Sequence, residues 1–152
     1  MGRYLTYHYI TCNGFVHLQK YRINRAKRLL GLSQETYIKR MLERYHMQDS
    51  KPMDTSVDKS LSLSRDMCPK ISEEKKKMSK ILYASVVGSL MYTMMCTRPD
   101  ISYVVGLVSR YQSNLGQKHW MKIKRILRYL KETSNYMLCY QWEKRFAIDK
   151  LV

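Results

Sequence analysis

The sequence is poor in the residues that build turns, disulfide frameworks and membrane spans. Six glycines and three prolines in 152 residues are too few for a low-complexity linker or for an all-β chain full of turns. Four cysteines are too sparse for a disulfide scaffold. The longest uncharged run, residues 81–97, is shorter than the ~20 residues that a bilayer requires. We therefore expect a globular protein with no membrane partner.

Acidic residues are scarce as well. Asp and Glu number 12 against 28 Lys and Arg, which gives a formal net charge of +16. The excess lies in two blocks, because residues 1–48 and 81–152 each carry +7 while residues 49–80 carry +2. With 45% hydrophobic residues and 13 tyrosines, the chain does not have the composition of a disordered basic tail. Such a domain binds a polyanion, lies on an anionic membrane surface or belongs to a larger protein with acidic parts elsewhere.

Motifs for catalysis and metal binding are also missing. No pair of Cys or His has zinc-ligand spacing, no Gly-x-Ser-x-Gly string presents a serine nucleophile, and no glycine-rich loop can hold a phosphate. The only adjacent acidic pair, Glu73–Glu74, precedes a run of lysines. We therefore predict no catalytic residue, no metal site, no cofactor and no small-molecule substrate.

The hydrophobic patterns predict a mainly α, α+β fold with four to five helices and short strands near the N- and C-terminal ends. Residues 4–10 and 15–18 are rich in β-forming residues and flank Asn13–Gly14, a strong tight-turn signal. A third short strand is expected over residues 28–32, and a closing strand over residues 136–141.

Two helices and a connector are expected in the middle of the chain. Ser33 is a good N-cap for a first helix that ends before Pro52. Residues 49–72 lack periodicity and predict an extended surface connector, followed by a short charged helix over residues 72–80. Residues 82–96 are apolar nearly all round, which predicts a core helix whose small side is closely approached by a neighbour. That small side consists of Ala84, Ser85, Gly88 and Ser89.

A helix is then expected to restart at Pro99 and to stop at residues 114–116, with one buried apolar stripe. Its stripe consists of Ile101, Val104, Val105 and Val108.

The last predicted helix, residues 118–131, is the best candidate for a functional site. Its apolar side chains, from Trp120 to Leu130, fall on one arc, and no acidic residue interrupts the rest. The cations there are Lys118, Lys122, Lys124, Arg125, Arg128 and Lys131. Because a solvated face normally mixes signs, we predict that these cations contact the phosphates of a nucleic-acid duplex, either DNA or RNA–DNA. A solvated outer face is the alternative.

The same helix contains Arg125-Ile126-Leu127-Arg128, which matches the Arg-x-Leu-Arg string of secreted oomycete effectors. In those effectors the string follows a cleaved signal peptide near the N-terminus. Here it lies late in the chain, and polar residues interrupt the first 20 residues, so an intracellular location (cytoplasm or nucleus) is favoured over secretion. A secreted interaction protein that acts on a host protein partner is the alternative function.

Several strings in a fixed order resemble the Pol polyprotein of copia-type LTR retrotransposons. They lie within residues 20–141, and the resemblance is to the reverse-transcriptase thumb and connection before ribonuclease H. The strings are Leu32–Tyr37, Lys51–Thr55, Tyr83–Ser85, Gly88–Tyr92, Thr97–Ile101, Ser109–Tyr111, His119–Trp120 and Lys124–Lys131.

The resemblance implies a supporting role in gripping a template–primer duplex by its backbone. In the family the polymerase aspartates lie upstream, in a Tyr-Val-Asp-Asp turn, and the ribonuclease H carboxylates lie downstream. No position of this chain matches either set, so no catalytic residue is carried over. We therefore expect a catalytically inactive reverse-transcriptase fragment over residues 20–141, with divergent ends at residues 1–19 and 142–152. A polymerase subunit completed by another chain is a further alternative.

The chain departs from the family pattern at three loops. Thr55–Ser56 stands where the family usually has Thr-Pro, residues 114–116 where it has Asn-Pro-Gly, and residues 131–133 where it has Lys-Gly-Thr. The last change removes a glycine that is expected to take a positive φ at a helix end, at a cost of about 1 kcal/mol.

Overall fold

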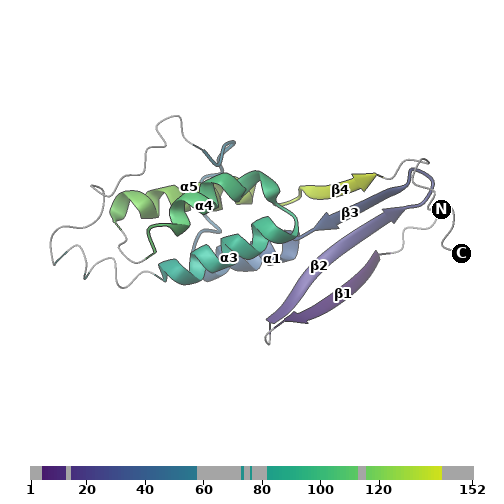
Figure 1. The fold of residues 1–152 in the computed structure, drawn as a ribbon, viewed down its shortest axis with the longest axis horizontal. Coiled ribbons are helices and arrows are strands. Elements are labelled where there is room, and N and C mark those ends of the chain that lie inside the picture. Colours follow the sequence, from purple (N-terminus) through teal and green to yellow (C-terminus); the bar gives the residue numbers. More distant parts are fainter. Residues whose placement is uncertain are drawn as a thin grey trace, which may run out of the picture. The chain divides into compact units, whose positions relative to one another are not determined.

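The computed structural model describes residues 5–12, 15–57, 73, 76, 82–112 and 116–141. The strands are β1 (Leu5–Cys12), β2 (Phe15–Asn24), β3 (Leu29–Ser33) and β4 (Met137–Gln141). The helices are α1 (Glu35–Arg44), α3 (Tyr83–Cys96), the 3₁₀-helix η2 (Pro99–Ile101), α4 (Ser102–Ser109) and α5 (Gln117–Glu132) (Figure 1). Glu73 and Lys76, within the predicted charged helix, are also helical. The predicted α+β class, with strands near both ends, is confirmed.

The chain divides into two compact units. One comprises residues 1–37 and 135–152 and contains the sheet, and the other comprises residues 38–134 and contains most of the helical structure. These units do not coincide with the boundaries expected after residues 19 and 141, which remain predictions.

The sheet is antiparallel throughout, with the strand order β1-β2-β3-β4 (Figure 1). It joins segments that are far apart in the sequence, because β3 pairs with β4 and Gly31 lies opposite Cys139. The predicted hairpin is confirmed in its two strands, while its turn at Asn13–Gly14 lies outside the described residues. β2 is longer than expected and ends at Asn24, so the basic turn between β2 and β3 is confined to residues 25–28.

Helix α1 has defined local structure at both ends. Ser33 Oγ accepts the main-chain N–H of Glu35 at 3.3 Å, as its predicted capping role requires, although Gln34 directly precedes the helix. At the other end His46 takes a positive φ of 54°. There the N–H of Met47 donates to Leu42 O at 2.8 Å and the N–H of His46 donates to Glu43 O at 3.1 Å. This pair of bonds is a Schellman motif, a termination that usually uses glycine in place of His46.

The core of the helical unit consists of apolar side chains that repeat at helical spacing. The four residues of the stripe predicted for η2 and α4 are each at most 1% exposed, which confirms that prediction. Three helices supply most of the remaining core. Their fully buried members are Ile38, Val86, Val87, Leu90, Ile123, Ile126, Leu127 and Leu130.

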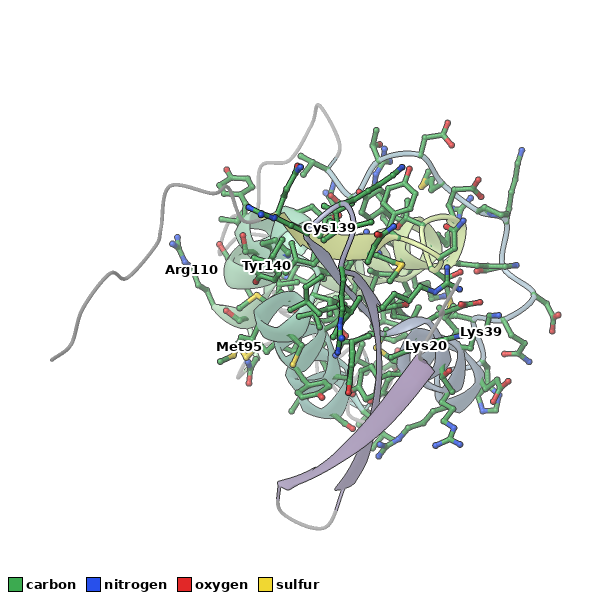
Figure 2. The ribbon with its side chains drawn as sticks, turned by 90° about the vertical axis from the view of Figure 1, so that its right-hand side faces the viewer. Lys20, Lys39, Met95, Arg110, Cys139 and Tyr140 are labelled. Carbon is green, nitrogen blue, oxygen red and sulfur yellow. The ribbon has the colours of Figure 1, made fainter. Side chains whose placement is uncertain are left out.

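Helix α3 is buried on one side and exposed on the other, so the predicted core helix is confirmed on one side only. Met95 is 80% exposed (Figure 2), and a side-chain carbon added at Gly88 would meet nothing within 4 Å. Among the described residues, the predicted close approach is seen beside Ser85 and Ser89, whose hydroxyls each lie 3.0 Å from the Tyr45 hydroxyl. The exposed side therefore carries both a small residue, Gly88, and the large apolar side chain of Met95.

Two helix ends differ from the predicted ones. α4 ends at Ser109, ahead of the predicted stop at residues 114–116, and the Ser109 hydroxyl donates to Gly106 O at 2.9 Å. α5 continues through Glu132, and its C-cap Thr133 has φ of −102°. The residue in place of the family glycine is therefore helical, and the expected strain of a positive φ is not present there.

Candidate nucleic-acid interface

Helix α5, which carries the six predicted contact residues, is held by the core along its whole length. Its buried side includes the apolar side chains expected there, with Trp120 only half-buried. At its start the main-chain N–H of Gly116 donates to His119 Nδ1 at 3.1 Å, and the His119 ring stacks on Tyr111 with 4.3 Å between the ring centroids. The opposite surface of the helix is consequently fixed in orientation.

Three of the six cations bind a neighbouring stretch of main chain, residues 50–55, which we term the strap. Arg125 donates from Nη2 to Thr55 Oγ1 at 2.8 Å and from Nε to Thr55 O at 3.3 Å. Arg128 Nε donates to Lys51 O, and Lys131 Nζ donates to Ser50 O at 2.7 Å. The structure therefore brings Arg125, Arg128 and Lys131 together around one protein segment.

The strap corresponds to the first part of the predicted surface connector. Residues 51–57 are irregular and mostly exposed, as expected, but the contacts with α5 show that they are not a free linker. Ser50 is tied at its start, because its hydroxyl donates to Met47 O at 2.6 Å. Residues 58–72 of the predicted connector lie outside the described part of the chain.

The other three predicted contact residues belong to the first half of α5. Lys118 and Lys124 are exposed and Lys122 is half-buried. Lys124 Nζ lies 5.8 Å from the ring centroid of Trp120, a distance at which a cation is attracted to the face of an aromatic ring. Among the six predicted residues, Arg125, Arg128 and Lys131 are thus the strap-bound cations, and Lys118, Lys122 and Lys124 precede them in the helix.

A buried arginine at the far end of α5 is a feature that the sequence reasoning missed. Arg98 is 2% exposed, and its guanidinium binds Asp100 from Nε at 3.0 Å and from Nη2 at 2.7 Å. The same group donates to Thr133 O at 3.0 Å and to Thr133 Oγ1 at 2.7 Å. Tyr129 completes the cluster by donating its hydroxyl to Asp100 at 2.8 Å. From the sequence, the segment around Pro99 is predicted as a helix start and is one of the strings of the family resemblance, but neither indicates that Arg98 is buried.

The electrostatics of this cluster favour an ionised Asp100. Partial burial raises the pKa of the Asp100 carboxyl, but the hydrogen bonds from Arg98 and Tyr129 and the positive charge of Arg98 outweigh it and hold that pKa below its ordinary value. Partial burial and the bond to Asp100 raise the pKa of the Tyr129 hydroxyl. The cluster fixes the end of α5 and offers no group poised for proton transfer.

His119 is a second residue to which the sequence reasoning gave no role. It is completely buried, and its Nε2 has no hydrogen-bond partner among the described residues. Burial lowers the pKa of the His119 imidazole. Its spacing of four and seven residues from Ile123 and Ile126 is the signal that places it on the buried side.

Metal binding and membrane spanning were tested on the described residues. Within residues 5–12, 15–57, 73, 76, 82–112 and 116–141, no group of three or more His, Cys, Asp or Glu could hold a metal ion. Over the same residues, no helix has both the length and the apolar character to cross a bilayer.

Comparison with known proteins finds relatives but no matching family model and no matching solved structure. The retrovirus-related Pol polyprotein from transposon TNT 1-94 of Nicotiana tabacum is 53% identical over 116 residues, which are 76% of this chain and 9% of that polyprotein. The retrovirus-related Pol polyprotein from transposon RE1 of Arabidopsis thaliana is 39% identical over 114 residues, covering 73% of this chain and 7% of the relative.

A different kind of relative matches a shorter stretch. Secreted RxLR effector protein 161 of Plasmopara viticola is 44% identical over 61 residues, which are 40% of this chain and 43% of the effector. The chain thus spans less than a tenth of the two polyproteins, but those matches cover most of its own length. The resemblance inferred from the ordered strings is confirmed: over most of its own length, this chain is similar to one short segment of the copia-type retrotransposon Pol polyproteins.

Proposed function

We propose that this chain is a catalytically inactive part of a retrotransposon reverse transcriptase that binds a nucleic-acid duplex through its phosphate backbone. The observation that carries the proposal is the outer surface of α5. From residue 117 to residue 131 this helix contains six Lys and Arg and no Asp or Glu. Most of its apolar side chains are directed into the core, although Met121 is exposed, and every charged group on the outer surface over these residues is therefore positive.

The physical basis of binding is neutralisation of phosphates with release of counterions. Lys118 and Lys124 are exposed on a helix that the core holds in place, so duplex binding has to order their side chains but not the backbone that carries them. Phosphate contacts of this kind position a protein on a duplex without reading its bases. The expected partner is therefore a DNA or RNA–DNA duplex of any sequence, as in the template–primer contact that the family resemblance implies.

The proposed lack of catalysis concerns this chain alone. No position matches the aspartates of the polymerase turn, and Glu73–Glu74 is the only adjacent acidic pair in the sequence. Phosphoryl transfer by the two-metal mechanism needs carboxylates that hold both ions. The purified chain should therefore show neither nucleotide incorporation on a primed template nor cleavage of the RNA strand of a hybrid.

The experiment that tests the proposal is a binding titration with duplexes of unrelated sequence over a series of salt concentrations. Affinity should be the same for each sequence and should fall linearly on a plot of log K against log salt. Affinity that does not change between low and moderate salt would contradict the electrostatic account. Strong preference for one sequence would contradict backbone recognition.

A second candidate function comes from the similarity to the Plasmopara viticola effector. In this alternative the chain is a secreted protein that binds a protein of a host. Within the Arg-x-Leu-Arg string, Ile126 and Leu127 are completely buried, while Arg125 and Arg128 bind the strap. Those contacts give the string a role in folding, which favours the first proposal. Detection of the mature protein outside the cell with a trimmed N-terminus would reverse this ranking.

A further inference from the structure

We propose that the strap, residues 50–55, competes with the phosphate backbone for Arg125, Arg128 and Lys131. In this account a duplex first contacts Lys118, Lys122 and Lys124, and it reaches the other three cations only after the strap has left them. The inference rests on the proposed function and adds to it an autoinhibitory contact within the same site.

The geometry places the strap where an anion would bind. Arg125, Arg128 and Lys131 follow one another at intervals of three residues, so about 4.5 Å of helix rise separates each from the next. Their partners on the strap are the carbonyl oxygens of residues 50, 51 and 55 and the Thr55 hydroxyl. The strap thus supplies a row of oxygen acceptors to a row of cations, as a phosphate backbone would.

The chemistry of the acceptors favours exchange. In the bonds that hold the strap to α5, the acceptors are uncharged carbonyl and hydroxyl oxygens. Each of these bonds joins a cation to a neutral oxygen, whereas a phosphate oxygen carries negative charge, adds a Coulombic attraction and can bind a guanidinium through two parallel N–H groups. Phosphate oxygens are therefore better partners for these side chains than the carbonyl oxygens that now hold them.

The strap is built so that it can leave without unfolding the core. Lys51, Pro52, Asp54 and Thr55 are exposed, so water can satisfy the carbonyl groups that the cations release. Ser50, at the start of the strap, stays anchored through its bonds to Met47 O, and Met47 is 7% exposed. Ser50 is therefore the residue about which the strap would rotate away from α5.

The first test uses Thr55→Val, which removes the hydroxyl acceptor of Arg125 without changing any charge. Thr36→Val is the matched control, because Thr36 is exposed on α1. If the strap competes, Thr55→Val should bind an RNA–DNA duplex about two- to fivefold more tightly than the wild type, the effect of losing one hydrogen bond. Thr36→Val should bind as the wild type does. Equal affinity of Thr55→Val and wild type would overturn the inference.

The second test follows the strap itself by NMR relaxation of the main-chain amides of the full chain. Order parameters of residues 51 and 53–57 should fall when the duplex is bound, and should also fall in Thr55→Val without any duplex, because the strap is then released. Unchanged or higher order parameters in the bound wild type would overturn the inference.

A second probe separates failure of the inference from failure of the proposed function. Inorganic polyphosphate presents charged oxygens without duplex geometry. If the duplex does not bind at low salt but polyphosphate binds and lowers the order parameters of residues 51 and 53–57, the proposed function fails and the strap competition stands. If polyphosphate binds and leaves these order parameters unchanged, or if neither probe binds, the strap competition is overturned.

Discussion

The guanidinium of Arg98 closes the C-terminal end of α5 by binding Thr133. Nη1 donates to Thr133 O at 3.0 Å and Nη2 donates to Thr133 Oγ1 at 2.7 Å, although 35 residues separate the two in sequence. The positive charge thereby meets the negative end of the helix dipole. Because Asp100 binds the other edge of the same group, one side chain joins the beginning of η2 to the end of the helix that carries the candidate interface.

Replacing Arg98 by Lys should therefore destabilise the protein far more than the retained charge suggests. Lysine cannot bind Asp100 and Thr133 together, and breaking a buried pair leaves polar groups without partners. We expect Arg98→Lys to lower the free energy of unfolding in urea by about 2–4 kcal/mol. Arg110→Lys, at an exposed position, is the control and should change it by less than about 0.5 kcal/mol. Equal stability of the two variants would show that the cluster contributes little.

The buried His119 should make stability depend on pH. Burial holds its pKa in the folded protein below 6.5, the value expected when it is unfolded. The unfolded chain then takes up the proton first, so the His119 contribution is complete above pH 6.5 and is lost as the pH falls through that value towards the folded pKa. Urea unfolding at a series of pH values measures this loss.

His119→Gln removes the titrating group while keeping an acceptor for the N–H of Gly116, as in a capping box. This variant should show a weaker fall in stability below pH 6.5 than the wild type does. His46→Gln is the control, because His46 is exposed, and it should retain the wild-type fall. A fall of the same size in His119→Gln and wild type would assign the pH dependence to other groups.

The positive φ of His46 predicts a stabilising substitution. The left-handed conformation at the end of α1 has a steric energy cost for any residue with a Cβ atom, and glycine lacks that atom. We expect His46→Gly to raise the free energy of unfolding by about 0.5–1 kcal/mol. His46→Ala removes the same imidazole but keeps the steric cost, so it should bring no gain. If His46→Gly and His46→Ala are equally stable, the positive φ of residue 46 is not the source of any gain in stability.

The parts of the fold that could be predicted are those that local pattern determines. Ile101 and Val108 are buried because their spacing puts them on one side of a helix, and β1 and β2 pair because Asn13–Gly14 lies between two runs of β-forming residues. Helix α3 shows where this reasoning stops. Its composition is apolar on every side, and only the position of its neighbours decides that Met95 stays in water.

The candidate site could be predicted only in part, for a related reason. The charge on α5 is visible in the sequence, and all six cations belong to the helix as expected. The contact between the strap and α5 cannot be predicted from the sequence, because the acceptors are mainly main-chain carbonyls, which every residue has. Arg125 and Thr55 lie 70 residues apart, so no periodicity connects them. Arg98 was missed because sequence spacing does not predict that an arginine is buried with Thr133.

The measurement that tests the central claim most directly is the salt dependence of duplex binding in two variants of equal net charge. One replaces Lys118, Lys122 and Lys124 of α5 by Gln, and the other replaces the exposed Lys27, Arg40 and Arg110 by Gln. If α5 is the interface, the first variant should bind more weakly, and the slope of log K against log salt should become shallower by about 2–3, while the second should keep nearly the wild-type slope. Equal slopes in the two variants would contradict the account, because the protein would then attract nucleic acid through its net charge and not through α5.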